Sequence, residues 1–186
     1  RPPRPPVGRP RLGMSSGRDP AEIAAAGVPA DRPRRTAYLA PGQLVASAEP
    51  ADVSTILGSC VAVCLWDARS RIGGANHFLL PDWAGSEGGS ARYGNVATER
   101  LVRRLEQLGA SRRGLRAKLF GGAAILAAFR DRDDHLGARN VEVARRLLAD
   151  LSIPIMAEDV GGNRGRKLIF RTDDGLALVR LIQEGP

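Results

Sequence analysis

The sequence predicts a mixed fold of the α+β or layered α/β class. Apolar, β-prone runs fill much of the first half of the chain and return at its end, and two segments further along carry apolar residues at helical spacing. Several strands around an early and a late helix are typical of mixed folds. With 186 residues, the chain is long enough for one domain with a substantial core.

The strands of the first half lead into a predicted hairpin. Residues 38–47 favour a strand broken by Pro41 and Gly42, and residues 53–57 favour a second strand that leads into a Gly-Ser turn. Two β-prone runs around a short polar loop then predict a β-hairpin. The first run, the loop and the second run are residues 60–66, 67–70 and 75–80.

Two amphipathic helices are predicted in the second half. The first ends at Gly109, in the usual position of glycine after a helix, and the second begins with Asn140 as its N-cap. Their apolar stripes are Ala97, Leu101, Val102, Leu105 and Leu108, and Val143, Ala144, Leu147, Leu148 and Leu151. Strands are predicted at residues 115–120, 153–157, 167–171 and 176–182.

The N-terminal segment, residues 1–36, is predicted to be a disordered arm, and residues 37–186 a single domain. The arm is rich in proline and arginine, and Tyr38 is the first aromatic residue of the chain. The arm has no apolar core with a cleavage site, so it does not favour a secretory signal, and Met14 is a candidate natural start.

The basic charge does not by itself indicate a nucleic-acid partner. Eight arginines and three acidic residues of the arm account for +5 of the formal net charge of +8. A nucleic-acid binder is expected to gather basic and aromatic residues on a folded face, and aromatic residues are few here. No apolar run reaches the roughly 20 residues of a membrane span, so we expect no membrane insertion.

Cys60 and His77 form the predicted reactive pair. If the hairpin loop centres on Ala68 and Arg69, Cys60 lies directly opposite His77, with Cβ atoms about 4.5–5.5 Å apart. A facing histidine is a common means of activating a cysteine thiol. The tight turn at Gly58 and Ser59 can aim backbone N–H groups at an oxyanion. These four residues therefore bring nucleophile, base and oxyanion donors together.

A structural alternative exists for the same pair. Cys60 could be a small buried hydrophobic residue and His77 a hydrogen-bonded core histidine, and hairpin spacing alone does not decide between the two interpretations. Cys64 lies four residues after Cys60 on the same strand and is predicted to be core. His135 lies in a polar loop and is not predicted to be catalytic. Two cysteines and two distant histidines lack the spacing of a zinc site, so no metal is expected.

A glycine-rich loop, residues 159–166, is a second candidate site. Free N–H groups in such a loop can bind an anionic or carboxamide group, which makes Gly161, Gly162, Asn163 and Arg166 candidate substrate-loop residues. The alternative is a hairpin connection in which glycine supplies a positive φ. The loop lacks the Lys-Ser/Thr ending of a phosphate-binding P-loop.

Six separated motifs lie between about Tyr38 and the C-terminus. They are LGSCVAVCLWD at 57–67, GGANHFLLP at 73–81, RYG at 92–94, KLFGGA at 118–123, GARN at 137–140 and DVGGNRGRK at 159–167. In this order they closely resemble the signature of the CheD family, the chemoreceptor glutamine deamidases of bacterial chemotaxis. The number and order of the motifs make the resemblance specific.

The resemblance implies a fold and a set of site residues. The implied fold has two packed β-sheets flanked by helices, similar to the catalytic domain of bacterial deamidating toxins. The implied catalytic residues are Cys60, His77 and the hydroxyl residue six positions before the cysteine, which is Ser54. Thr55 lies beside it, and either hydroxyl could orient the imidazole.

The resemblance also implies an activity and partners. The activity is hydrolysis of glutamine side chains of methyl-accepting chemoreceptors to glutamate and ammonia, through a Cys-His thioester, in the cytoplasm and without a cofactor. The implied partners are the receptors and, in organisms that have it, the phosphatase CheC. Two alternatives stay open: a related cysteine transglutaminase or esterase on the same receptors, and a non-catalytic adaptor that binds receptors or CheC.

Overall fold

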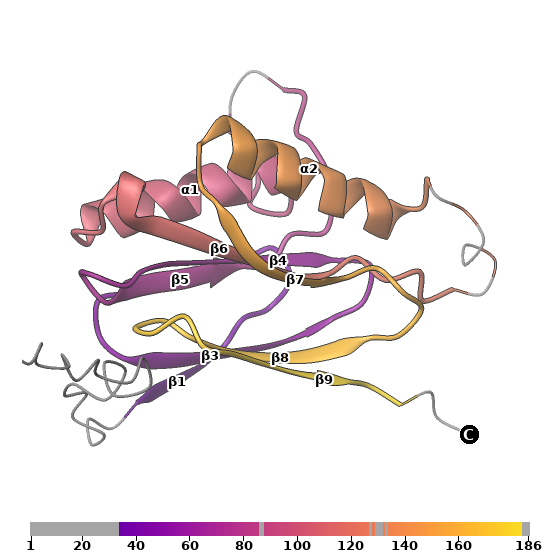
Figure 1. The fold of residues 1–186 in the computed structure, drawn as a ribbon. Helices are drawn as coiled ribbons and strands as arrows, with labels where there is room; N and C mark the ends of the chain where they lie inside the picture. Colours follow the sequence, from indigo (N-terminus) through magenta and orange to yellow (C-terminus); the bar gives the residue numbers. More distant parts are fainter. Residues whose placement is uncertain (1–33, 86–87, 127, 129–131, 133, 184–186) are drawn as a thin grey trace, which may run out of the picture. The chain divides into compact units, whose positions relative to one another are not determined.

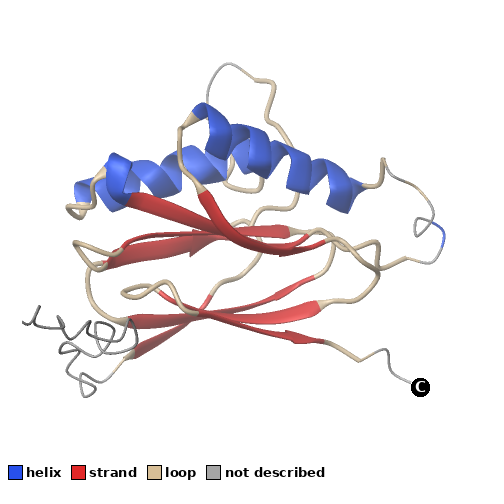
Figure 2. Ribbon diagram, viewed as in Figure 1, coloured by secondary structure: helices blue, strands red, loops and turns tan. Residues whose placement is uncertain are grey.

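Two β-sheets lie face to face, and two helices cover the outer face of one of them (Figure 1). The computed structural model describes residues 34–85, 88–126, 128, 132 and 134–183. Figure 2 shows the resulting layers in this part of the chain: helices, one sheet and then the second sheet. The layered α/β class and the two packed sheets are therefore confirmed, with both helices on one side.

The two sheets divide the strands unequally. The four-stranded sheet has the order β1-β3-β8-β9, with β1 at Arg35–Tyr38, β3 at Ala51–Leu57, β8 at Arg166–Arg171 and β9 at Ala177–Leu181. The five-stranded sheet has the order β2-β5-β4-β6-β7, with β2 at Leu44–Ser47, β5 at Ile72–Asn76, β4 at Val61–Asp67, β6 at Leu115–Gly121 and β7 at Ile155–Val160. The helices are α1 at Gly94–Gln107 and α2 at Leu136–Asp150, and a short 3-10 turn covers Arg112–Gly114.

The central strand β4 is covered on both faces, which explains its unbroken apolar sequence. Val61, Val63 and Leu65 pack under the helices, in one core cluster with Leu101 of α1. Ala62 and Cys64 face the other way, into a second cluster between the sheets. Cys64 is fully buried, as predicted for a core residue. Side chains of β4 with even numbers therefore point between the two sheets.

Three predicted features differ in the structure. The predicted strand at 38–47 is two strands, β1 and β2, which lie in different sheets and are separated by a turn with Gly42 at φ 80°. The connection between β7 and β8 passes from one sheet to the other, so the hairpin alternative for residues 159–166 is wrong. Helix α2 begins at Leu136 with His135 as its N-cap, whose ring accepts a hydrogen bond from Ala138 N, so Asn140 lies within the helix.

The hairpin is present, but its register differs from the prediction by two residues. Cys64 pairs with Ala75 and Asp67 pairs with Ile72. The turn holds four residues because Asp67 accepts hydrogen bonds from the amides of Arg69 and Arg71, and Arg71 adopts φ 58°. Cys60 is therefore not directly opposite His77. Because the shift is an even number of residues, the two still share one face of the sheet.

The arm predicted at residues 1–36 lies almost wholly outside the described residues, so its disorder stays a prediction. Of its last residues, Arg35 and Thr36 belong to β1, which pairs with β3 in parallel. No helix in the described part of the chain is long and apolar enough to cross a membrane.

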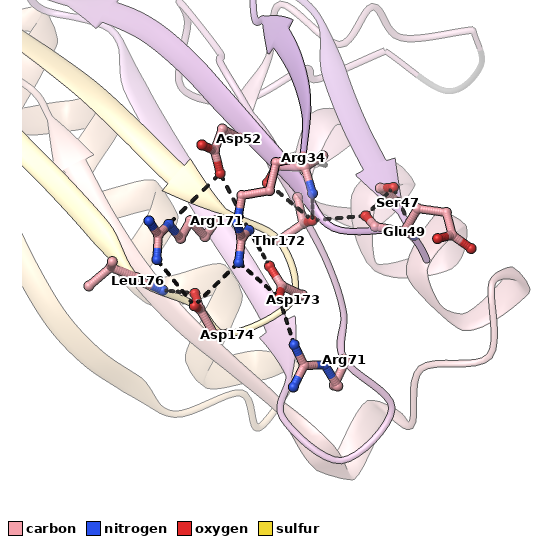
Figure 3. Close-up of polar contacts among 11 residues, drawn as sticks. Arg34, Ser47, Glu49, Asp52, Arg71, Arg171, Thr172, Asp173, Asp174 and Leu176 are labelled. Carbon is pink, nitrogen blue, oxygen red and sulfur yellow. Dashed lines mark hydrogen bonds and ion pairs between the residues drawn. The ribbon is translucent and has the colours of Figure 1, made fainter. Parts of the chain in front are cut away.

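An ion network ties the start of β1 to two turns (Figure 3). The Asp173 carboxylate, in the turn between β8 and β9, is buried and accepts hydrogen bonds from Arg34 and from Arg71 of the β4–β5 turn, the latter at 2.8 Å. Burial raises the pKa of Asp173, but the hydrogen bond and charge of Arg34, with the charge of Arg71, outweigh this and leave the pKa below its ordinary value. The folded state therefore favours the ionised carboxylate.

We expect Asp173→Asn to lower the free energy of unfolding by about 1–3 kcal/mol at pH 7, because it removes charge-assisted hydrogen bonds from a buried group. A carboxylate with a lowered folded pKa stabilises the protein above its unfolded pKa of about 3.9 and loses that effect as the pH falls through the folded value. Urea unfolding at pH 7 and at successively lower pH should show the difference from wild type shrinking. Asp174→Asn, a more exposed neighbour, is the control and should change stability by less than about 0.5 kcal/mol.

Candidate active site

The turn at residues 58–60 joins β3 of one sheet to β4 of the other, and all three of its carbonyls are bound. Gly58 O accepts from Ala123 N at 2.9 Å, and Cys60 O accepts from Gly122 N at 2.8 Å. Ser59 O accepts from Asn140 Nδ2 at 3.0 Å. The donors come from the loop after β6 and from α2. These two segments therefore fix the orientation of the cysteine turn.

Close packing against the turn requires glycine in the KLFGGA motif. A Cβ on Gly121 would lie 2.2 Å from Cys60 O, and the residue has φ 106°. A Cβ on Gly122 would lie 2.4 Å from a methyl group of Val141. A side chain at either position would push the loop away from the cysteine turn.

Two backbone amides of the turn remain as donors. In a trans peptide the C=O and N–H point in opposite directions, so the bound carbonyls of Gly58 and Ser59 direct the amides of Ser59 and Cys60 to the other side. Neither amide donates to another residue in the described part of the chain, whereas Val61 N donates to Phe78 O at 3.1 Å. This pair of amides is free to bind a developing oxyanion.

Cys60 is partly buried, and its thiol is not in a disulfide. It packs against the core between the sheets, like the other even-numbered residues of this segment. Burial raises the pKa of the Cys60 thiol, and its own backbone amide opposes this only partly. The resting residue therefore favours the neutral thiol, and a base is required to make the thiolate.

His77 follows β5 and is held at both ends of its backbone. His77 N donates to Gln43 O at 3.0 Å, and His77 O accepts from Gly42 N at 2.7 Å. His77 as a whole residue is 1% exposed. Burial lowers the pKa of His77, and the hydrogen bond to Leu39 O partly offsets it, so the ring favours its neutral form.

The hydrogen bonds around the ring define its tautomer. Thr55 Oγ1 lies 2.9 Å from His77 Nδ1 and 2.7 Å from Leu39 O. A carbonyl only accepts, so we assign the hydroxyl proton of Thr55 to Leu39 O and the ring proton to Nδ1. Nδ1–H then faces two acceptors, Thr55 Oγ1 at 2.9 Å and Leu39 O at 3.5 Å. The lone pair then lies on Nε2, which is buried and has no hydrogen-bond partner among the described residues. Nε2 is the nitrogen available as a base.

The structure brings Thr55, and not Ser54, to the imidazole. Side chains of β3 alternate, so Val53, Thr55 and Leu57 are buried while the residues between them are not. Ser54 Oγ lies instead 3.5 Å from Ala37 O on β1. Burial alternation in the strand would have distinguished the two hydroxyls, whereas counting back from the cysteine did not.

Cys60 and His77 lie on the same face of their strands as diagonal neighbours. Val61 and Phe78, the residues that follow each of them, form a two-way hydrogen-bonded bridge of 3.1 and 3.0 Å. Diagonal neighbours have Cβ atoms typically about 7 Å apart, a separation that long side chains can bridge. No hydrogen bond joins the Cys60 thiol to the ring among the described residues. The pKa shifts of both groups favour a neutral thiol and a neutral imidazole, and not a permanent ion pair.

The glycine-rich loop, residues 159–166, hydrogen-bonds to the end of β6 and to the loop that follows β6. Gly161 N donates to Gly121 O at 2.9 Å, and Gly162 O accepts from Ala124 N at 2.8 Å. Both glycines have positive φ with open space around a would-be Cβ, so their role is backbone conformation. Arg166 is buried and donates to Asp159 at 2.9 Å. Of the four predicted loop residues, Asn163 lines a surface groove.

That groove opens beside the cysteine turn and has a volume of about 370 Å³. Its walls are mainly apolar, and several of its aliphatic side chains are strongly exposed. The residues that line it include Ile56, Gly58, Ile125, Asn163, Gly165 and Ile182. In the described part of the chain, no three His, Cys, Asp or Glu side chains gather where they could hold a metal ion.

The fold and the site together define a two-sheet α/β protein in which a thiol, an imidazole and a hydroxyl lie near the turn that joins the sheets. Comparison with protein-family models matches residues 79–181 to the model described as CheD chemotactic sensory transduction. The matched segment supplies the donors that bind the cysteine turn.

Curated relatives match over most of their length. "Probable chemoreceptor glutamine deamidase CheD 1" of Anaeromyxobacter dehalogenans is 51% identical over 162 residues, which cover 87% of this chain and 94% of the relative. "Probable chemoreceptor glutamine deamidase CheD" of Rhodospirillum rubrum is 47% identical over 78% of this chain and 82% of its own. That of Sulfurimonas denitrificans is 38% identical over 79% and 94%. The chain belongs to the CheD family.

The raised pKa of Cys60 predicts how the thiol reacts. We expect alkylation of Cys60 by iodoacetamide to rise with pH to a midpoint above the ordinary thiol pKa of about 8.5, because burial favours the neutral form. Mass spectrometry of quenched samples measures the rate at each pH. Cys64, fully buried, should stay unmodified in the folded protein and serves as the internal control. A midpoint well below 8.5 would instead indicate a resting thiolate.

Proposed function

We propose that the chain is a protein-glutamine deamidase that acts on methyl-accepting chemoreceptors. The names of its relatives support the substrate class, and they describe chemoreceptor glutamine deamidases. The observation that carries the chemistry is the buried His77 Nε2, which lies on the same sheet face as Cys60 and has no hydrogen-bond partner among the described residues. The backbone amides of Ser59 and Cys60 likewise donate to no other residue in that part of the chain.

The first half of the proposed reaction forms a thioester. His77 Nε2 takes the proton of the Cys60 thiol, and the sulfur attacks the carboxamide carbon of the glutamine. The amides of Ser59 and Cys60 bind the oxyanion of the tetrahedral intermediate. The intermediate collapses as the C–N bond breaks, and the imidazolium gives its proton to the leaving nitrogen, which departs as ammonia.

The second half hydrolyses the thioester. His77 Nε2 takes a proton from water, the resulting hydroxide attacks the thioester carbon, and the C–S bond breaks. The sulfur recovers its proton from the imidazolium, so glutamine and water become glutamate and ammonia with the enzyme unchanged. Thr55 keeps the proton on Nδ1 and thereby keeps Nε2 basic through both halves.

The groove, the free thiol and the family resemblance indicate the substrate segment, the cellular location and a partner. The apolar groove beside Gly58 suits the apolar side of a receptor segment that presents a glutamine to Cys60. A free thiol as nucleophile requires a reducing environment, which supports a cytoplasmic location. Binding to the phosphatase CheC, in organisms that have it, is proposed from the family resemblance.

Mass spectrometry of a receptor cytoplasmic fragment tests the activity. We expect particular glutamines to become glutamates with the wild-type protein and not with Cys60→Ala, because the variant lacks the nucleophile. Conversion by both proteins would exclude Cys60 as the nucleophile. Conversion by neither, with binding retained, would indicate an adaptor, and adducts formed in the presence of an added amine would indicate a transglutaminase.

Exchange of the two neighbouring hydroxyls tests the orientation of His77. We expect Thr55→Val to lower kcat for receptor deamidation by about tenfold to a hundredfold, because Nδ1 loses its acceptor and the tautomer is no longer fixed. Thr55→Ser retains the hydroxyl and should stay within about threefold of wild type.

Ser54→Ala is the matched control, since Ser54 is adjacent in sequence but its side chain lies against β1. Its kcat should change by less than about twofold, as expected for a side chain without contact to the imidazole. A larger loss in Ser54→Ala than in Thr55→Val would contradict the assignment.

A further inference from the structure

We propose that Asn140 is a positioning residue that sets the direction of the Cys60 N–H, and with it the geometry of the oxyanion site. This inference rests on the proposed acyl-transfer chemistry of Cys60. Asn140 lies in the second turn of α2, is fully buried, and contacts neither the thiol nor the imidazole through any hydrogen bond in the described structure.

The side-chain amide of Asn140 donates hydrogen bonds to two segments of the site. Nδ2 donates to Ser59 O at 3.0 Å and to Leu79 O at 2.9 Å. Ser59 immediately precedes the nucleophile, and Leu79 lies two residues after His77. A single carboxamide therefore joins the cysteine turn to the chain that leaves the histidine, next to the Val61–Phe78 bridge.

The bond to Ser59 O fixes one particular peptide plane. The Ser59 carbonyl and the Cys60 N–H belong to the same trans peptide and point in opposite directions. Holding the carbonyl toward α2 holds the N–H away from α2, on the side where the Cys60 amide donates to no other described residue. Rotation of this plane would turn the N–H away from the oxyanion.

The neighbouring carbonyls are bound differently. Gly58 O and Cys60 O accept from backbone amides of the loop after β6, whereas Ser59 O accepts from a side chain. Within the described residues, Asn140 is the one side chain that donates to the carbonyls of this turn. A substitution there can release the Ser59–Cys60 peptide while the two flanking carbonyls stay bound.

The energetics argue against a purely space-filling role. Asn140 Oδ1 is buried without a hydrogen-bond partner in the described structure. An unsatisfied buried polar atom costs roughly 1–3 kcal/mol, and a leucine of similar size would avoid this cost in a helix. The carboxamide is therefore explained by the two bonds that it donates and not by packing.

Two reactions of the Cys60 thiol distinguish a role of Asn140 in the oxyanion site from a purely structural role. Acylation by p-nitrophenyl acetate passes through an oxyanion, whereas alkylation by iodoacetamide does not. We expect Asn140→Leu to lower acylation of Cys60 and kcat for receptor deamidation by about 100-fold, the lower end of the range for loss of an oxyanion donor. Alkylation should stay within about twofold, with the same pH midpoint, because the thiol and the imidazole keep their surroundings.

Two further variants complete the test. Val143→Ala removes buried volume from the same helix and controls for loosening of α2, so its ratio of acylation to alkylation should equal that of wild type. Asn140→Asp also lacks the amide donors and replaces Asn140→Leu if the latter does not fold.

Three results would contradict the proposed role of Asn140. Equal loss of acylation and alkylation, no loss of either, or the same change of ratio in Val143→Ala would each overturn the role of Asn140. If the wild-type protein is acylated but converts no receptor glutamine, the deamidase proposal fails, and the ratio of the two reactions still decides the role of Asn140.

Discussion

Three carbonyls in succession, those of Gly58, Ser59 and Cys60, are bound by donors from outside the turn, and the rest of the site depends on this constraint. Without these bonds a short turn between two sheets could present its peptides in several orientations. With them, the carbonyls all face the donors and the amides of Ser59 and Cys60 face away. In the proposed reaction, this pair of N–H groups is held in place before the oxyanion forms, so binding the charge requires no reorganisation of the turn.

Two loops, one behind the other, hold this turn through backbone hydrogen bonds. The glycines at 161 and 162 bond to the backbone at 121 and 124, and residues 122 and 123 bond to the cysteine turn. Motifs that lie far apart in the sequence are therefore neighbours, and most of them contribute backbone groups and not side chains. The segment that matches the family model, residues 79–181, therefore holds the turn of Cys60 in place, although Cys60 itself lies outside this segment.

The fold class and most strands could be predicted because apolar periodicity reflects burial, and burial decides the layers. The register of the hairpin could not, because the sequence 67–70 does not specify that Arg71 joins the turn with a positive φ. Asparagine commonly caps helices, yet Asn140 lies inside α2 because its tertiary bonds outweigh local preference. The choice of Thr55 over Ser54 requires the face of β3 to be known, which is a property of the packed sheets.

The hydroxyl and the imidazole that it orients belong to different layers: Thr55 lies on the four-stranded sheet, and His77 continues from the five-stranded one. Their 2.9 Å contact spans the core between the sheets, where Phe170 packs against Trp66 at a ring separation of 6.4 Å. If His77 is the base, as proposed, its orientation depends on the spacing of the layers. A core substitution that shifts one sheet against the other would then separate Thr55 from Nδ1 and lower activity in a protein that is still folded.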